Sequence, residues 1–182
     1  MGGKYFLSKE ISELMKNNVP PETIDGYLEP FCGAINVLMR MNDSYNCEAS
    51  DYHPDLIELW KEVQMNRFVC PSEITEQIYN DSKELESPSA IKGFIGFGMS
   101  FGGKFYSGYA DKYKGKKTEN FLQESINSLT KIRPKIKDID FQCISYDKLT
   151  PHNKLIYCDP PYQVTKFPIK YRTGTKNMIS LI

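Results

Sequence analysis

The chain has 182 residues, and its 23 basic and 23 acidic residues cancel to a formal net charge of zero. Apolar residues make up 40% of it and charged residues 25%, which predicts one globular domain and excludes a disordered chain. No apolar run approaches the length of a membrane span, and the first residues lack the apolar core of a signal peptide. We therefore expect an intracellular protein without a membrane span, located in the cytoplasm or nucleoid or of viral origin.

The cysteines and histidines predict no metal site. Five cysteines are scattered without a CxxC pair, and the two histidines, His53 and His152, are isolated. Such scattered cysteines are typical of reduced thiols in an intracellular compartment.

Charge is distributed unevenly along the chain. Residues 1–90 hold 7 basic and 16 acidic residues, a net charge of −9. Residues 91–137 hold 10 and 3, a net charge of +7, and residues 138–182 hold 6 and 4, a net charge of +2. A basic middle segment favours contact with a polyanion, although a solvated lysine-rich loop has the same composition.

Apolar periodicity predicts alternating helices and strands. The first half has a helix at 8–17, a strand at 23–28, a helical pattern through Leu38, a strand at 47–51 and a helix from Pro54. The second half has a helix at 72–85, a glycine- and aromatic-rich segment at 91–109, a helix that Thr118 caps and Pro134 stops, and strands at 139–143 and 155–159. This alternation predicts an α/β domain with a mainly parallel sheet.

The tetrapeptide Asp159-Pro160-Pro161-Tyr162 follows the last predicted strand, where an open α/β sheet binds ligands. Asp159 and the carbonyl of Pro160 can accept the two N–H bonds of an exocyclic amine, and Tyr162 offers a face for stacking. Two acceptors localise the lone pair of a poorly nucleophilic nitrogen, which can then attack a sulfonium methyl group in line. The pattern favours methyl transfer to an aromatic amine; alone, it also fits a proline-stiffened turn.

A second turn, Glu29-Pro30-Phe31-Cys32-Gly33-Ala34, joins a predicted strand to a helix. Glycine lets a ligand approach the backbone, and Asp51, 18 residues after Gly33, can hold ribose hydroxyls. The G-x-G-x-x-G phosphate fingerprint is absent, so an adenosyl cofactor without phosphates, such as S-adenosylmethionine, is favoured over NAD. A purely structural loop is the alternative interpretation.

Together, the motifs resemble those of Dam-type DNA adenine-N6 methyltransferases over nearly the whole chain. In the family's order they are Gly2-Gly3-Lys4, the turn at 29–34, Ser50-Asp51-Tyr52-His53-Pro54-Asp55-Leu56-Ile57, the glycine-aromatic segment, Phe141-Gln142-Cys143-Ile144-Ser145-Tyr146 and the tetrapeptide at 159–162. The resemblance implies a Rossmann-like sheet with helices on both faces. It also implies a single domain, 1–182, with an inserted target-recognition segment at 86–137.

The resemblance also implies roles for individual residues. The S-adenosylmethionine site would comprise Lys4, Phe31, Gly33, Asp51, Tyr146 and Asp159. Within it, Asp51 would hold the ribose and Tyr146 would border the adenine ring of the cofactor. Catalysis would rest on Asp159, Pro160 and Tyr162, which would grip an adenine flipped out of the duplex for direct methyl transfer to its N6 amine.

The segment from Gly93 to Lys117 is expected to face DNA. Its lysines can neutralise phosphates, and the DNA-binding residues would be Lys104, Lys112, Lys114, Lys116 and Lys117. Its aromatic residues can stack on bases or wedge into a groove, or they can form a buried cluster beneath a glycine-rich loop. These residues are Phe94, Phe97, Phe101, Phe105, Tyr106 and Tyr109.

The chain departs from the family pattern in two places. Ile35-Asn36 stand where relatives usually have a second glycine, and a β-branched residue tolerates a left-handed backbone poorly. The chain also ends 20 residues after Tyr162, whereas relatives continue. We therefore expect a C-terminally truncated sheet with the strand before Asp159 at its edge, completed by a missing segment or a partner. Alternative functions are an inactive domain that binds nucleic acid or a partner, and methylation of an RNA amine.

Overall fold

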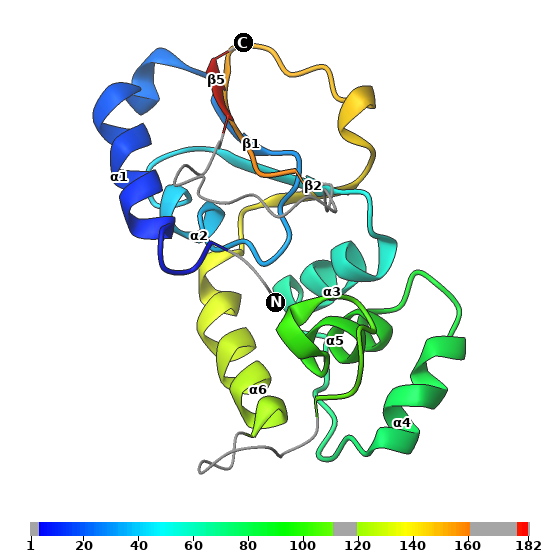
Figure 1. Cartoon of the computed structure of the whole chain (residues 1–182). Coiled ribbons are helices and arrows are strands. Elements are labelled where there is room, and N and C mark those ends of the chain that lie inside the picture. The colour runs from blue at the N-terminus through cyan, green and yellow to red at the C-terminus, as the bar shows by residue number, and fades with distance from the viewer. Residues whose placement is uncertain (1–3, 111–119, 161–177, 182) are drawn as a thin grey trace, which may run out of the picture.

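A five-stranded sheet forms the centre of the computed structural model, which describes residues 4–110, 120–160 and 178–181 (Figure 1). The strands are β1 (Gly26–Glu29), β2 (Cys47–Asp51), β3 (Asp140–Cys143), β4 (Lys154–Cys158) and β5 (Met178–Leu181). Their order is β3-β2-β1-β4-β5; the first four are parallel, and β5 is antiparallel to β4. Because parallel strands need crossover connections, this is the sheet of an α/β protein, as predicted.

Six α-helices accompany the sheet in the described part of the chain. They are α1 (Ser8–Asn18), α2 (Leu38–Met41), α3 (Pro54–Gln64), α4 (Glu76–Asp81), α5 (Ala90–Gly98) and α6 (Phe121–Ile132). Short 3₁₀ turns lie at Pro21–Thr23, Ser82–Glu84, Phe101–Gly103, Arg133–Lys135 and Tyr146–Lys148. In Figure 1, α1 and α2 lie to one side, α3 and α5 pack together, and α4 lies at the lower right.

One hydrophobic core joins the helices to one face of the sheet. Its strand members alternate along each strand, as side chains on one face do: Tyr27, Cys47, Ala49, Phe141, Leu155 and Tyr157. Each of the six α-helices contributes buried side chains to this core, including the fully buried Trp60 of α3. The flanking helices confirm the Rossmann-like α/β class; helices over the opposite face, which carries Leu28 and Ile156, stay a prediction.

Most predicted elements are present, with shifted ends. The strand at 47–51 and the helices from Ser8 and Pro54 are confirmed. The first strand begins only at Gly26, because Pro21–Thr23 form a 3₁₀ turn. In place of the helix predicted at 72–85, the structure has the shorter helix α4, followed by the 3₁₀ turn at Ser82–Glu84. Helix α6 begins at Phe121, where the Asn120 side chain accepts a 3.0 Å hydrogen bond from the Gln123 N–H; Thr118 lies outside the described residues.

Helix α5 occupies a glycine-rich segment that the sequence did not predict as helical. Ser89 caps its start by accepting the Lys92 N–H. Glycine costs about 1 kcal/mol relative to alanine inside a helix, so the segment reads as a loop. Close packing explains the glycines: a Cβ at Gly93 would lie 2.3 Å from the Asp55 carbonyl oxygen of α3, and one at Gly96 would lie 2.4 Å from the Phe105 ring.

Strand β5 overturns one expectation. The strand before Asp159, β4, was predicted to be a sheet edge, but β5 pairs with it along its length, from Leu155↔Leu181 to Cys158↔Met178. The tail was not predicted to contain a strand. The prediction of an exposed apolar edge at β4 is therefore wrong.

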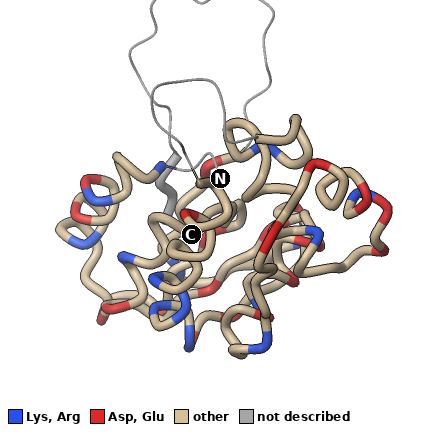
Figure 2. The backbone as a smooth tube through the Cα atoms, turned by 90° about the horizontal axis from the view of Figure 1, so that it is seen from below, with Lys and Arg blue, Asp and Glu red and all other residues tan. Residues whose placement is uncertain are grey.

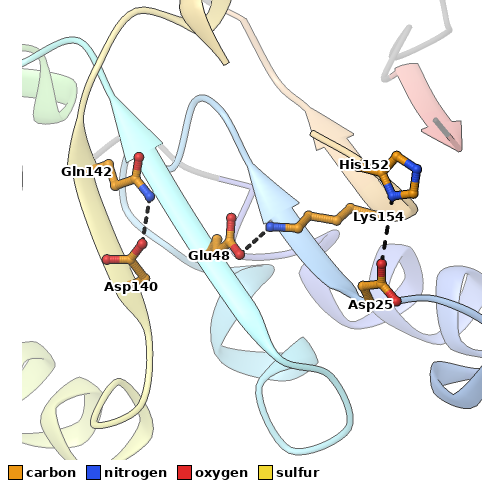
Figure 3. Close-up of polar contacts among 6 residues, drawn as sticks. All are labelled: Asp25, Glu48, Asp140, Gln142, His152 and Lys154. Atoms are coloured by element: carbon orange, nitrogen blue, oxygen red, sulfur yellow. Dashed lines mark hydrogen bonds and ion pairs between the residues drawn. The ribbon is translucent and has the colours of Figure 1, made fainter. Parts of the chain in front are cut away.

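Polar side chains form contacts on the face of the sheet opposite the core (Figure 3). Lys154 of β4 forms an ion pair with Glu48 of β2, reaching across β1. The path lies over Gly26, which has no side chain and is in register with Lys154. On β3, the Gln142 amide donates a 2.6 Å hydrogen bond to Asp140. The ion pair thus connects β2 and β4 on the face opposite the core, and the Gln142–Asp140 bond lies within β3.

Acidic and basic residues are marked along the backbone in Figure 2, and their balance differs between regions of the chain. Residues 72–90, around α4, include five acidic residues and one basic residue, which disfavours their contact with a polyanion. None of the helices within the described ranges is long and apolar enough to cross a membrane.

Candidate active site

A cavity of about 120 Å³ lies at the carboxyl ends of β1 and β4. These two strands are neighbours, yet the chain leaves β1 toward β2 on its other side, so the cavity occupies a switch point where open α/β sheets bind ligands. Its wall combines three segments: Lys4 near the N-terminus, residues 31–37 after β1, and Asp159 after β4. Glu29 and Tyr157, from the ends of the strands, complete it.

Lys4 and Asp159 form an ion pair within this cavity. The Lys4 Nζ lies 2.7 Å from Oδ1 and 2.9 Å from Oδ2 of Asp159, so it contacts both carboxylate oxygens. The two side chains are only 19% and 22% exposed, where water screens such a pair less than at the surface. The contact places the segment before α1 against the end of β4, although 155 residues separate the partners.

Glu29 places a second carboxyl group beside this pair. Its side chain is buried, and its Oε1 accepts a 2.6 Å hydrogen bond from the Tyr27 hydroxyl. Burial, supported by the nearby charge of Asp159, raises the pKa of Glu29 to about 8, against the opposing effect of the Tyr27 bond. Glu29 is therefore mostly protonated at neutral pH, and the cavity holds one ion pair and one neutral acid.

Asp51 fixes the turn that follows β1. Its Oδ2 accepts the Gly33 N–H at 3.2 Å, and its Oδ1 accepts the His53 N–H at 3.0 Å. The Trp60 indole N–H donates to the Gly33 carbonyl at 3.0 Å. Gly33 has a φ of 44°, a left-handed conformation that glycine adopts without steric cost. The end of β2 thus holds the cavity wall in place.

Ile35 carries the strain that its sequence position predicted. Its φ is 52°, in the left-handed region, and its side chain is fully buried in the core. Such a backbone costs a β-branched residue on the order of 1–3 kcal/mol and persists only where the surroundings enforce it. The turn is left-handed here although a β-branched residue with a buried side chain occupies the position.

Two aromatic rings lie next to the cavity. Phe31, in the wall, and Tyr146, in the 3₁₀ turn after β3, have centroids 5.2 Å apart and planes tilted by 41°. The Tyr146 side chain is exposed. Because the rings contact each other, a flat ligand would lie against the pair and not between its members.

The aromatic residues of the segment predicted to recognise the target mostly serve packing. Phe94 is buried in the core, and Phe97 and Phe105 pack against the His53 ring with centroids 5.0 and 4.1 Å away. Burial lowers the pKa of His53 below its usual value. Phe101 is exposed and retains a face for stacking. The buried-cluster alternative therefore describes these aromatics better than a set of stacking residues.

The predicted site residues fall into three groups. Lys4, Phe31, Gly33 and Asp159 line one cavity, which Asp51 and Tyr146 flank through Gly33 and Phe31. Pro160 and Lys104 are exposed and do not line it. The remaining predicted residues, Lys112, Lys114, Lys116, Lys117 and Tyr162, lie outside the described residues.

Glu29 and Tyr157 line the cavity without having been predicted to do so. An acidic residue that ends an apolar strand just before a glycine turn is the signal that could have indicated Glu29.

Comparison with models of protein families shows which family the chain belongs to. The model of the D12 class N6 adenine-specific DNA methyltransferases matches residues 1–97 and 103–180. The chain belongs to this family. A search of curated proteins found no match. As the family indicates, the protein is a site-specific DNA methyltransferase whose substrate is adenine in DNA and whose product carries a methyl group on N6.

Proposed function

We propose that this D12 class methyltransferase transfers the methyl group of S-adenosylmethionine to the N6 amine of a flipped-out adenine held at Asp159. The observation that carries the proposal is the shared cavity: Asp159, Lys4 and the turn after β1 meet at one switch point of the sheet. A donor and an acceptor bound there would be within reach of each other, as direct transfer requires.

The residues fit a phosphate-free adenosyl cofactor. The cavity, about 120 Å³, is smaller than the roughly 300–1,000 Å³ typical of whole-ligand pockets, so it would enclose only one end of the cofactor. Tyr146 and Phe31 would provide an aromatic surface for its adenine ring, and the Asp51 carboxylate beside the turn would accept hydrogen bonds from its ribose hydroxyls. When bound, S-adenosylmethionine supplies an electrophilic methyl group on a positively charged sulfur.

Asp159 holds the target amine in this proposal. Its carboxylate and the Pro160 carbonyl accept the two N6 hydrogens, which localises the nitrogen lone pair toward the methyl group. The nitrogen forms the new N–C bond as the S–C bond breaks and its electron pair goes to sulfur; one N6 proton then leaves to water. Lys4 orients the carboxylate by contacting both of its oxygens, and the carboxylate has lone pairs left to accept the amine.

DNA contacts complete the proposal. Flipping costs a few kcal/mol, which stacking of the base on Tyr162, at about 1–3 kcal/mol, and hydrogen bonds to its amine would offset. The inserted segment at 86–137 serves target recognition, with Lys104, Lys112, Lys114, Lys116 and Lys117 contacting phosphates and Phe101 able to stack. The closer assignment to Dam-type enzymes rests on the tetrapeptide at 159–162.

The test is transfer of label from methyl-labelled S-adenosylmethionine to nucleic acid. We expect labelling of adenine-containing duplex DNA, and excess unlabelled RNA should not compete. Labelling of RNA in preference to DNA would move the target to an RNA amine. A folded protein that binds DNA in a salt-dependent manner, but neither binds the cofactor nor labels the duplex, would show a binding domain and overturn the proposal.

A further inference from the structure

A basic groove lies beside the candidate active site. We define it by Tyr5, Asn36, Arg40, Ser128, Lys131 and Lys135, which line a depression of about 410 Å³. Its walls come from the start of α1, from α2 with the turn before it, and from the end of α6 with the 3₁₀ turn after it. These three segments are far apart in sequence, so no single motif indicates the groove.

The charge of the basic groove has one sign. Arg40, Lys131 and Lys135 line it, and no carboxylate of the described residues does. None of these three side chains forms an ion pair with a carboxylate in the described ranges; the Arg40 guanidinium donates a 2.9 Å hydrogen bond to the Ser8 hydroxyl. Lys131 and Lys135 belong to the basic segment at 91–137, whose net charge is +7, and Arg40 adds a third cation from the acidic first half of the chain. Uncompensated cations in one hollow attract a polyanion.

The basic groove adjoins the candidate active site. Ala34 and Asn36 line both the groove and the cavity that holds Asp159. When an adenine is held at Asp159, the phosphates of that nucleotide and of its next one or two neighbours must pass close to the cavity. Phosphate contacts position a protein on DNA without reading sequence, and such contacts are expected near a flipped base.

We propose that the basic groove binds the phosphate backbone of the substrate DNA next to the target adenine, through Lys131, Lys135 and Arg40. This inference rests on the proposed function and adds to it DNA contacts by residues other than the lysines at 104–117. The alternative anion for the same groove is the carboxylate of the cofactor, and its binding there predicts different outcomes in the test below.

The test compares Lys131→Gln with Lys16→Gln. Each change removes one positive charge from the last turn of a helix, α6 or α1. Both variants therefore lose the same kind of favourable interaction with the helix dipole. Lys16 acts electrostatically on Cys47 at the beginning of β2, so it lies near the amino ends of the strands, whereas the cavity lies at their carboxyl ends. Binding of a labelled duplex is measured by fluorescence anisotropy over a range of salt concentrations, and binding of S-adenosylmethionine is measured by calorimetry.

We expect Lys131→Gln to make the slope of log affinity against log salt shallower by about 0.9, and Lys131→Gln with Lys135→Gln by about 1.8. The double variant should lose about tenfold or more in DNA affinity at about 0.1 M salt. Lys16→Gln should match the wild type, and cofactor affinity should not change in any variant.

The failures of the two proposals are distinguishable. If the wild type binds and methylates duplex DNA but Lys131→Gln retains its salt slope, the groove inference is wrong and the proposed function stands. If cofactor affinity falls while the slope is unchanged, the groove belongs to the cofactor and the inference is equally overturned. If the wild type neither binds nor methylates DNA, both proposals fail.

Discussion

Two lysine–carboxylate ion pairs in this molecule have similar chemistry and exposure but lie in different surroundings. Lys4–Asp159 and Lys154–Glu48 both join segments distant in sequence, and their side chains have similar exposure, 19% and 22% in the first pair and 19% and 27% in the second. The second pair crosses β1 on the face of the sheet opposite the core (Figure 3). The first lies at the carboxyl ends of the strands, in a cavity beside a left-handed glycine turn.

The difference shows that position in the sheet, and not the chemistry of the pair, indicates function. Lys154 and Glu48 line neither the active-site cavity nor the basic groove of the described structure, and their ion pair connects strands. Lys4–Asp159 shares its surroundings with a buried neutral acid, two aromatic rings and a turn fixed by Asp51. Both pairs would be counted as structural salt bridges from their distances alone. Substitutions at the two pairs should therefore separate activity from stability.

The largest expected effect is on catalysis at Asp159. Asp159→Asn replaces one acceptor oxygen by an N–H₂ group that repels the target amine, and methyl transfer should fall by about 1,000-fold. Initial rates of label transfer measure this, and Glu48→Gln, the same substitution in the other ion pair, should keep the wild-type rate. Equal rates for the two variants would remove the distinction between the pairs.

Lys4→Met should reduce methyl transfer by about 100-fold, because a carboxylate displaced by about 1 Å loses its alignment with the amine. The thioether keeps most of the length of the side chain without its charge. The kinetic comparison is with Lys154→Met, which should not change the rate. A rate for Lys4→Met within about threefold of wild type would show that the lysine does not position Asp159.

Glu29 should make stability depend on pH. Its native pKa of about 8 exceeds the unfolded value, so between these values the native state binds the extra proton and stability falls as pH rises. Glu29→Gln keeps an acceptor for the Tyr27 hydroxyl and cannot ionise. As the pH rises from about 5.5 to about 8, its free energy of unfolding should increase by about 2 kcal/mol relative to that of the wild type. Urea unfolding at both pH values measures this, and parallel changes in the two proteins would contradict the assignment.

The smallest expected effect is that of the scaffold pair. Glu48→Gln should lower the free energy of unfolding by about 1 kcal/mol, as expected for a partly exposed ion pair. A double-mutant cycle with Lys154→Gln isolates the interaction of the two side chains. A coupling energy of zero would mean that the pair does not contribute to holding β2 and β4 around β1.

The local sequence pattern was enough to predict the helices and strands whose apolar residues recur with a clear period. The strand at 47–51 and the helix from Pro54 follow directly from apolar spacing and a proline at the first helical turn. Helix α5 could not be predicted, because its glycines permit contact with Asp55 and Phe105 that only the tertiary structure shows. Strand β5 depends on pairing with β4 and has little signal of its own.

The candidate site was accessible from sequence only in part. Strand ends and a glycine turn indicated Gly33, Asp51 and Asp159, whereas the place of Lys4 came from family resemblance because its partner is 155 residues away. Glu29 was missed because an acidic residue ordinarily indicates an exposed position. Its burial depends on the Tyr27 hydroxyl, two residues earlier on the same face of the sheet.

The most direct measurement is the identity of the product after a single turnover. The protein is mixed in excess with S-adenosylmethionine and a duplex that contains its adenines at defined positions, and the digested nucleosides are analysed by mass spectrometry. The account predicts N6-methyladenine from the wild type and from Glu48→Gln, and none above background from Asp159→Asn. Methylation of a different base, or N6-methyladenine formed equally well by Asp159→Asn, would contradict it.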